Sequence, residues 1–280
     1  MVIKKDIYDK NSILILAKGT EVTDIVVERL KRLRLYNPDD IIDSEEIETE
    51  EIKTKETTKK GEQTTLSITQ NFRKKINIRN FQYLELPNKI LGTIIFESKN
   101  KPWWIYVNAL SNYLDWIYTH SINVSLISTM MAVELKYNDK ELWNISLGAF
   151  FHDLGMLVVP KSIISKSEPL NDMEMSNLKQ HCELGISSLK PFTLPKECTD
   201  IVIEHHERLD GSGYPKGLKG DEISRNAKIV MIADVIDEVT TERPYRGTLG
   251  MDDAFMIVRE NKRKFSQELI DLLEKIINSM

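Results

Sequence analysis

The histidines are the residues of this chain best suited to chemistry, because all of them lie between residues 120 and 206 and several stand beside other metal ligands. The 280-residue sequence holds 5 histidines. His152 precedes Asp153 in the motif FHDLG, and His205 and His206 are adjacent in IEHHERLDGSGYP. Neutral imidazole and carboxylate both bind divalent transition metals. The pattern therefore predicts a metal centre suited to hydrolysis of a phosphoester.

The pair His152–Asp153 must stand near a helix end if both side chains bind one ion, because adjacent helical residues point about 100° apart. Gly155 follows two residues later and is typical of a helix terminator. We therefore expect the pair at the end of a buried helix. Taken alone, one such pair is more often a satisfied histidine with a capping aspartate.

His205–His206 is a stronger signal, because the pair closes the apolar stretch 201–203 and precedes a glycine-rich loop at 211–215. Two adjacent histidines can also be surface residues, but their place before such a loop favours a site. His120 and His181 stand alone on helical segments, where a histidine is more often a core or surface residue than a ligand.

Asp234 stands inside the apolar helical run IVMIADVI. A carboxylate flanked by apolar residues faces water or has a compensating partner, and a metal ion is one such partner. Asp237 follows three residues later and shares the same helix face.

Composition limits the classes of protein and partner. Hydrophobic residues make up 41% of the chain, and the net charge of −5 argues against nonspecific binding to DNA or RNA. The 2 cysteines form no CxxC pair, so we expect reduced thiols. No apolar run is long enough for a membrane span and the N-terminus lacks a signal-peptide core, so we expect a cytoplasmic protein.

Hydrophobic patterning predicts a mainly α protein in two parts. Residues 1–100 read as a small N-terminal α+β module, with a flexible acidic and Thr/Lys-rich segment at about 40–72 and a strand at Ile90–Phe96. Residues 101–280 read as a helical domain that carries the candidate site. The helices expected there cover residues 120–136, 140–153, 171–190, 196–209, 224–241, 251–263 and 265–278, with a loop at 211–220.

Several motifs together resemble one known family. They are YTHSINV, FHDLG followed by VP, QHCELG, HHERLDGSGYPKGLKGDEI and KIVMIADVIDEVTTERPYR, in that order over about residues 118–246. In these the chain resembles the HD-GYP family of cyclic-di-GMP phosphodiesterases, a branch of the HD metal-dependent phosphohydrolases. Residues 1–39 also look like a small domain often attached to this family.

The resemblance implies an all-helical HD-GYP catalytic bundle with two metal ions, and it assigns roles to the motif residues. Asp153 would bridge the two ions, and Asp237 would lie near the nucleotide. Arg243 and Arg246 would contact the substrate phosphates, although a solvated helix end explains them almost equally well. The first ion would be held by His120, His152, Asp153 and Asp234. The second ion would be held by His181, His205 and His206. The signature loop beside the substrate would be Gly213, Tyr214 and Pro215.

The implied reaction is hydrolysis of cyclic-di-GMP to pGpG and, after a second round, GMP. His152 and Asp153 would be the catalytic residues. A hydroxide that bridges the two metal ions would attack the phosphorus atom in line with the leaving oxygen. His and Asp ligands suit iron or manganese better than zinc. The expected partners are cyclic-di-GMP and either a second copy of the chain or a signalling protein.

Two positions depart from the family pattern. Met156 stands where the family has a lysine, which removes a cation that could contact phosphate. Trp116 stands where some members have a glutamate for a third ion, so we predict two ions. Two alternatives follow: hydrolysis of another nucleotide, or a catalytically impaired module that binds cyclic-di-GMP or a protein partner for signalling.

Overall fold

The structure is a computed structural model that describes residues 2–3, 7–8, 14–16, 41–42, 72, 82–97, 101, 103–113, 115–241 and 248–279. Near the N-terminus it gives short antiparallel strand pairs. The strands are β1 (Val2–Ile3) with β4 (Ile41–Ile42), and β2 (Ile7–Tyr8) with β3 (Leu14–Leu16). Most of the segment 40–72 lies outside the described residues. The division of the chain at residue 100 stays a prediction.

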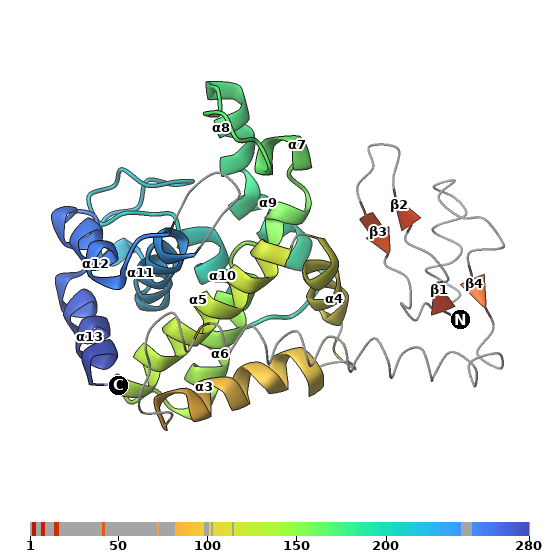
Figure 1. Cartoon of the computed structure of the whole chain (residues 1–280). Helices are drawn as coiled ribbons and strands as arrows, with labels where there is room; N and C mark the ends of the chain where they lie inside the picture. The colour runs from red at the N-terminus through yellow and green to blue at the C-terminus, as the bar shows by residue number, and fades with distance from the viewer. Residues whose placement is uncertain are drawn as a thin grey trace.

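The rest of the described chain is helical, which confirms the mainly α fold class (Figure 1). The helices share one apolar core. They are α3 (Gln82–Gly92), α4 (Trp104–Tyr113), α5 (Asp115–Glu134), α6 (Asp139–Phe151), α7 (Lys161–Ile164), α8 (Asp172–Lys179), α9 (His181–Leu189), α10 (Lys196–Glu204), α11 (Arg225–Thr240), α12 (Met251–Glu260) and α13 (Gln267–Asn278).

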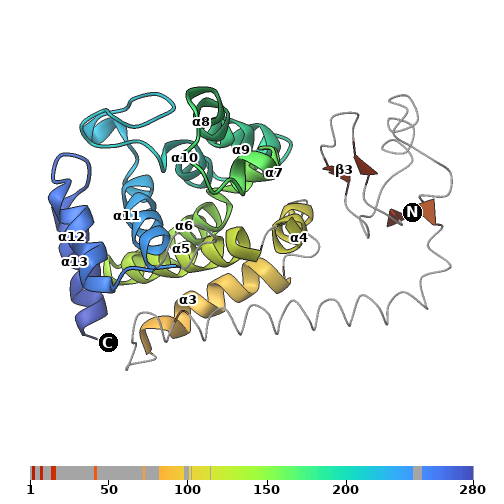
Figure 2. The same ribbon diagram turned by 45° about the horizontal axis from the view of Figure 1, so that its top comes forward.

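Helix α5 runs through the middle of the bundle, with α6 and α11 packed along it (Figures 1 and 2). Almost every side chain from Ile117 to Ala132 is buried, polar ones included. A helix that is covered all round belongs to the core. This burial is why a polar residue of α5, such as His120, must find its partners on neighbouring helices.

Helix α6 delivers the His152–Asp153 pair to the centre of the bundle. Its start is fixed by a reciprocal cap: Asn138 Oδ1 accepts from the Glu141 N–H at 3.1 Å, and Glu141 Oε2 accepts from the Asn138 N–H at 2.8 Å. The helix ends at Phe151, so His152 is its C-terminal cap. The prediction that the pair stands at a helix end is confirmed.

The strand predicted at Ile90–Phe96 is wrong. The segment continues α3 and then forms a π-helical turn, Thr93–Glu97. Leu84, Leu91 and Ile95 are buried at helical spacing, and α3 packs on α5. Isoleucine-rich runs favour strands by local propensity, but burial against a neighbouring helix outweighs a preference of this size.

Other expected helices differ in extent. The helix expected at 120–136 is α5, which begins at Asp115. Residues 171–190 form two helices, α8 and α9, which meet at Gln180. Helix α8 buries no side chain, whereas α9 packs into the bundle. Helix α10 ends at Glu204, earlier than expected. The loop expected at 211–220 is confirmed. Within the described ranges, no helix combines the length and apolar character needed to cross a membrane.

Candidate metal centre

The candidate ligands come together from five helices or helix ends. His120 lies on α5, His152 and Asp153 follow α6, and Asp234 lies on α11. Two groups result, and in each the candidate ligand atoms lie within 4.8 Å of one another. We call His120, His152 and Asp234 the inner group. We call His181, His205 and His206, from α9 and the end of α10, the outer group.

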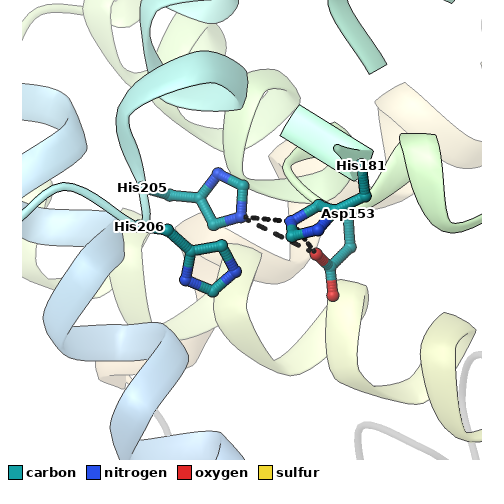
Figure 3. Close-up of side chains that lie close together, drawn as sticks. All are labelled: Asp153, His181, His205 and His206. Atoms are coloured by element: carbon teal, nitrogen blue, oxygen red, sulfur yellow. Dashed lines mark hydrogen bonds and ion pairs between the residues drawn. The ribbon is translucent and has the colours of Figure 1, made fainter. Parts of the chain in front are cut away.

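Asp153 lies between the two groups and turns one carboxylate oxygen to each. Its Oδ2 is 3.5 Å from His152 Nε2 and 3.8 Å from His120 Nε2. Its Oδ1 is 3.3 Å from His181 Nε2 and 3.7 Å from His205 Nε2 (Figure 3). Asp153 Oδ1 is buried and has no hydrogen-bond partner. A buried carboxylate oxygen without a partner is costly, and a cation on each side of this carboxylate would remove that cost.

The ring orientations of the outer histidines also suit a cation. His181 Nδ1 is 2.7 Å from the Leu178 carbonyl, and His205 Nδ1 is 3.0 Å from the Val202 carbonyl. Because a carbonyl can only accept, each Nδ1 carries a proton, and Nε2 is the ring nitrogen that faces the site. These two Nε2 atoms are 3.2 Å apart. A metal ion bound by both would take the place of this contact.

In the inner group, burial and charge act on the pKa values in opposite directions. Burial by itself lowers the pKa of His120, but hydrogen bonds and charge from Asp234 and Asp237 outweigh it and raise this pKa to about 10. Burial by itself raises the pKa of Asp234, but His120, at 3.0 Å, lowers it. Without metal the His120 proton therefore sits where an ion would bind, and metal binding must displace it.

In the outer group, burial lowers the pKa of His206 well below its usual value, and the charge of the neighbouring His205 lowers it further. The ring is therefore neutral, which is the form that binds metal. The His206 side chain is 19% exposed, whereas the buried His152, His181 and His205 side chains are 0% exposed. Its Nδ1 also lies 3.9 Å from Asp234 Oδ2. Solvent therefore reaches the centre on the side of His206.

The loop with Gly213, Tyr214 and Pro215 lies against the outer group. The Tyr214 ring stacks on His206, with centroids 4.7 Å apart and planes 29° apart. The Tyr214 N–H donates to the His206 carbonyl at 3.1 Å. Lys179 Nζ lies 5.2 Å from the centre of the Tyr214 ring and adds a positive charge there.

Glu207 holds this loop, and the sequence analysis gave it no role. Its side chain is buried, and its carboxylate accepts the N–H of Lys216 at 2.7 Å and of Leu218 at 3.0 Å. Gly213 is needed because a Cβ there would overlap the backbone of Glu207 and Arg208. The sequence signal for Glu207 is its place between the histidine pair and the glycine-rich loop.

Gly155 is not the helix terminator that we predicted, since α6 has already ended at Phe151. It lies in a 3-10 turn, Leu154–Leu157, that packs directly on α9. A Cβ at Gly155 would overlap the carbonyl of His181 and come within 2.7 Å of Gly185 N. Gly155 therefore allows the close approach that brings His181 up to Asp153.

Asp237 is buried behind His120, and its place near the nucleotide stays a prediction. Its side chain is 0% exposed, and its Oδ2 is 2.7 Å from His120 Nδ1. Asn123 Nδ2 donates to its Oδ1 at 2.8 Å, and Thr241 Oγ1 is 3.1 Å from the same oxygen. This carboxylate supports the His120 ring from behind. Asn123 was missed, because a lone asparagine in an apolar helix carries no sequence signal.

Arg243 and Arg246 lie outside the described residues, so their contact with phosphate stays a prediction. Met156 is 9% exposed and packs in the core.

A family model for the HD domain matches residues 105–269, more than half of the chain. The chain belongs to the HD domain family. A solved structure, Bd1817, a HDG"Y"P protein from Bdellovibrio bacteriovorus, matches with a TM-score of 0.54 at 22% identity over 99% of this chain and 95% of its own. It supports the same fold for the HD domain described here.

Curated relatives include the 3'3'-cGAMP-specific phosphodiesterase 3 of Vibrio cholerae, 34% identical over 163 residues, which are 57% of this chain and 35% of the relative. A second is the Cyclic di-GMP phosphodiesterase of Thermotoga maritima, 32% identical over 174 residues, 61% of this chain and 47% of the relative. The resemblance recognised in the motifs is thereby confirmed. The chain spans less than half the length of either relative.

Proposed function

We propose that this HD domain is a metal-dependent phosphodiesterase that hydrolyses a cyclic dinucleotide, with cyclic-di-GMP as its substrate. The observation that carries the proposal is the Asp153 carboxylate, which directs one oxygen to each group of ligand atoms and leaves Oδ1 buried without a partner. The names of the curated relatives support the same reaction class.

The ligand set supports two divalent ions, with iron or manganese favoured because the ligands are imidazole and carboxylate without a thiolate. The inner group and Asp153 would hold one ion, and the outer group and Asp153 the other. Two bound ions supply a nucleophile from water at neutral pH and neutralise charge on the phosphoryl oxygens. A reducing compartment, as we expect in a cytoplasm, suits iron and the free thiols of Cys182 and Cys198.

The chain's own residues prepare the site for a phosphodiester. The carbonyls of Ala149, Leu178 and Val202 hold the imidazoles of His152, His181 and His205 with their Nε2 atoms directed inward. Burial of these rings excludes bulk water on every side except that of His206. We expect substrate to arrive there, where Lys179 offers a cation to its phosphates and Arg243 and Arg246 are proposed to contribute forked donors.

The test is turnover by the purified chain after loading with Fe²⁺ or Mn²⁺ under reducing conditions. We expect cyclic-di-GMP to give pGpG and then GMP, as separated by chromatography. An Asp153→Asn variant should be inactive, whereas Asp252→Asn, which changes an exposed aspartate of α12, should match the wild type. No product with either metal would contradict the proposed reaction.

Met156 favours a second candidate, a module that binds cyclic-di-GMP without hydrolysing it, because the residue is buried and supplies no cation for phosphate. The same samples separate the two: binding by calorimetry without product supports the module. A parallel incubation with 3'3'-cGAMP tests the substrate range suggested by the Vibrio relative.

A further inference from the structure

The two groups of ligand atoms differ in charge. The inner group has a carboxylate of its own, Asp234, 3.0 Å from His120 Nε2. The outer group consists of histidines and shares the Asp153 carboxylate, and Asp234 Oδ2 approaches it only to 3.9 Å, at His206 Nδ1. A divalent cation in the inner group therefore meets more negative charge at short range than one in the outer group.

The partners of the histidine Nδ1 atoms add to this difference in charge between the two groups. The Nδ1 atoms of His152, His181 and His205 all contact backbone carbonyls, which are uncharged. His120 Nδ1 instead contacts the carboxylate of Asp237 at 2.7 Å. A carboxylate behind a ligating histidine fixes the ring and raises its basicity, and loss of such a partner costs about 10- to 100-fold in metal affinity.

Asp237 is held in this place by its packing and its hydrogen bonds. It is 0% exposed, and Asn123 Nδ2 and Thr241 Oγ1 both lie within hydrogen-bond distance of its Oδ1. Its Oδ2 remains directed at His120. Asn123 is itself buried on α5, one turn from His120. The arrangement joins α5 to α11 behind the inner group.

We propose that Asp237 is a positioning residue that makes the inner group the tighter metal site, so that the two ions load in order, inner before outer. This rests on the proposed metal centre. The exposed side of His206 adds a route by which the outer ion exchanges with solvent. The occupancy of the outer site then depends on the concentration of free metal ion. The chain with one ion, bound in the inner group, is a stable intermediate.

The test is to titrate metal-free full-length protein with Mn²⁺ alone and to monitor binding by calorimetry and electron paramagnetic resonance. With one equivalent we expect the signal of an isolated ion, and with two the signal of a coupled pair. In Asp237→Asn the tighter step should weaken about 10- to 100-fold. Thr241→Val, which removes one contact to Asp237, should shift the same step less, and Asp252→Asn should leave both steps unchanged.

Each result decides the inference. Two results would overturn ordered loading and leave the metal centre in place. One is a coupled signal that grows from the first addition of Mn²⁺. The other is an unchanged tight step in Asp237→Asn protein that folds normally by circular dichroism. If Asp237→Asn does not fold, the shift in Thr241→Val decides in its place. Absence of any Mn²⁺ binding overturns the inference together with the metal centre.

Discussion

The inner and outer groups of the metal centre are built from different kinds of structure. The inner group comes from α5, the end of α6 and α11, which pack along one another through the middle of the bundle. The outer group comes from the first residue of α9 and from the end of α10, with the loop of Tyr214 against it. One group is thus part of the core, while the other depends on helix ends and a loop.

This difference assigns separate tasks to the two groups. The core packing that buries Asp234 and Asp237 also fixes the inner ligands, so the inner group should resist perturbation. The outer group includes the partly exposed side chain of His206, so it is the part where we propose that substrate arrives. Asp153 is the one residue that serves both groups, and its loss should remove the distinction between them.

The largest effect is expected for Asp153→Ala, because it removes the carboxylate shared by both groups. We expect metal content to fall below about a tenth of an ion per chain and turnover to become undetectable, since both sites lose a ligand. Elemental analysis of the purified variant measures the first effect. Retention of one full ion would show that the inner group does not need the shared carboxylate.

Gly155→Ala should affect the outer group selectively, because its Cβ would overlap the His181 carbonyl. The backbone there cannot move without shifting α9, so we expect a loss of about 1–3 kcal/mol in the free energy of unfolding and loss of the outer ion. Denaturant melts and metal content measure both.

Gly185→Ala is the matched control from the same helix contact. Its Cβ would meet Val202 Cγ1 at 2.9 Å and Gly155 N at 3.3 Å, which is less severe than the 1.9 Å approach of a Gly155 Cβ to the His181 carbonyl oxygen. We expect a smaller loss of stability and both ions retained. Equal loss of inner and outer ions in Gly155→Ala would contradict the separation of the two groups.

Glu207→Gln should loosen the loop over the outer group. Its carboxylate accepts two backbone N–H groups, and an amide leaves one of them facing another donor, at a cost of about 1–3 kcal/mol. We expect faster hydrogen exchange at Lys216 and Leu218 and a KM raised about tenfold, with the inner ion unaffected.

Glu222→Gln is the control for this loop. It accepts one backbone N–H, from Lys219, and is exposed, so a glutamine oxygen can replace it. Exchange rates in Glu207→Gln that match those of this control would show that Glu207 does not hold the loop.

The smallest effect is expected at Tyr214, whose ring stacks on His206. Tyr214→Phe keeps the ring and should leave the outer ion's affinity nearly unchanged. Tyr214→Leu removes the stacking, worth about 0.5–1.5 kcal/mol, and should weaken only the second step of a Mn²⁺ titration. A change in the first step would mean that the loop also supports the inner group.

The ligands could be found from sequence because their motifs keep residue types in a fixed order along the chain, and the structure brings all of these side chains together. The core helices α5, α6 and α11 were also predictable from their apolar runs, and α6 and α11 in addition begin at side-chain caps, Asn138 and Ser224. Local signals were sufficient wherever a residue's role follows from its immediate neighbours.

Roles that arise from contacts between distant segments were missed. Asp237 shares a face with Asp234, but only the packing of α11 on α5 shows that it lies behind His120. Gly155 is needed because α9 approaches it, and Ile90–Phe96 is helical because α3 is buried on α5. The local sequence pattern predicts neither of these contacts.

The most direct test of the account is the position of bound metal, measured by anomalous diffraction from crystals of the Mn²⁺-loaded protein. The account predicts two peaks about 3.5–4 Å apart. One should lie among His120, His152 and Asp234 and the other among the outer histidines, with one oxygen of Asp153 bound to each. A single peak, or ions that do not contact Asp153, would contradict it.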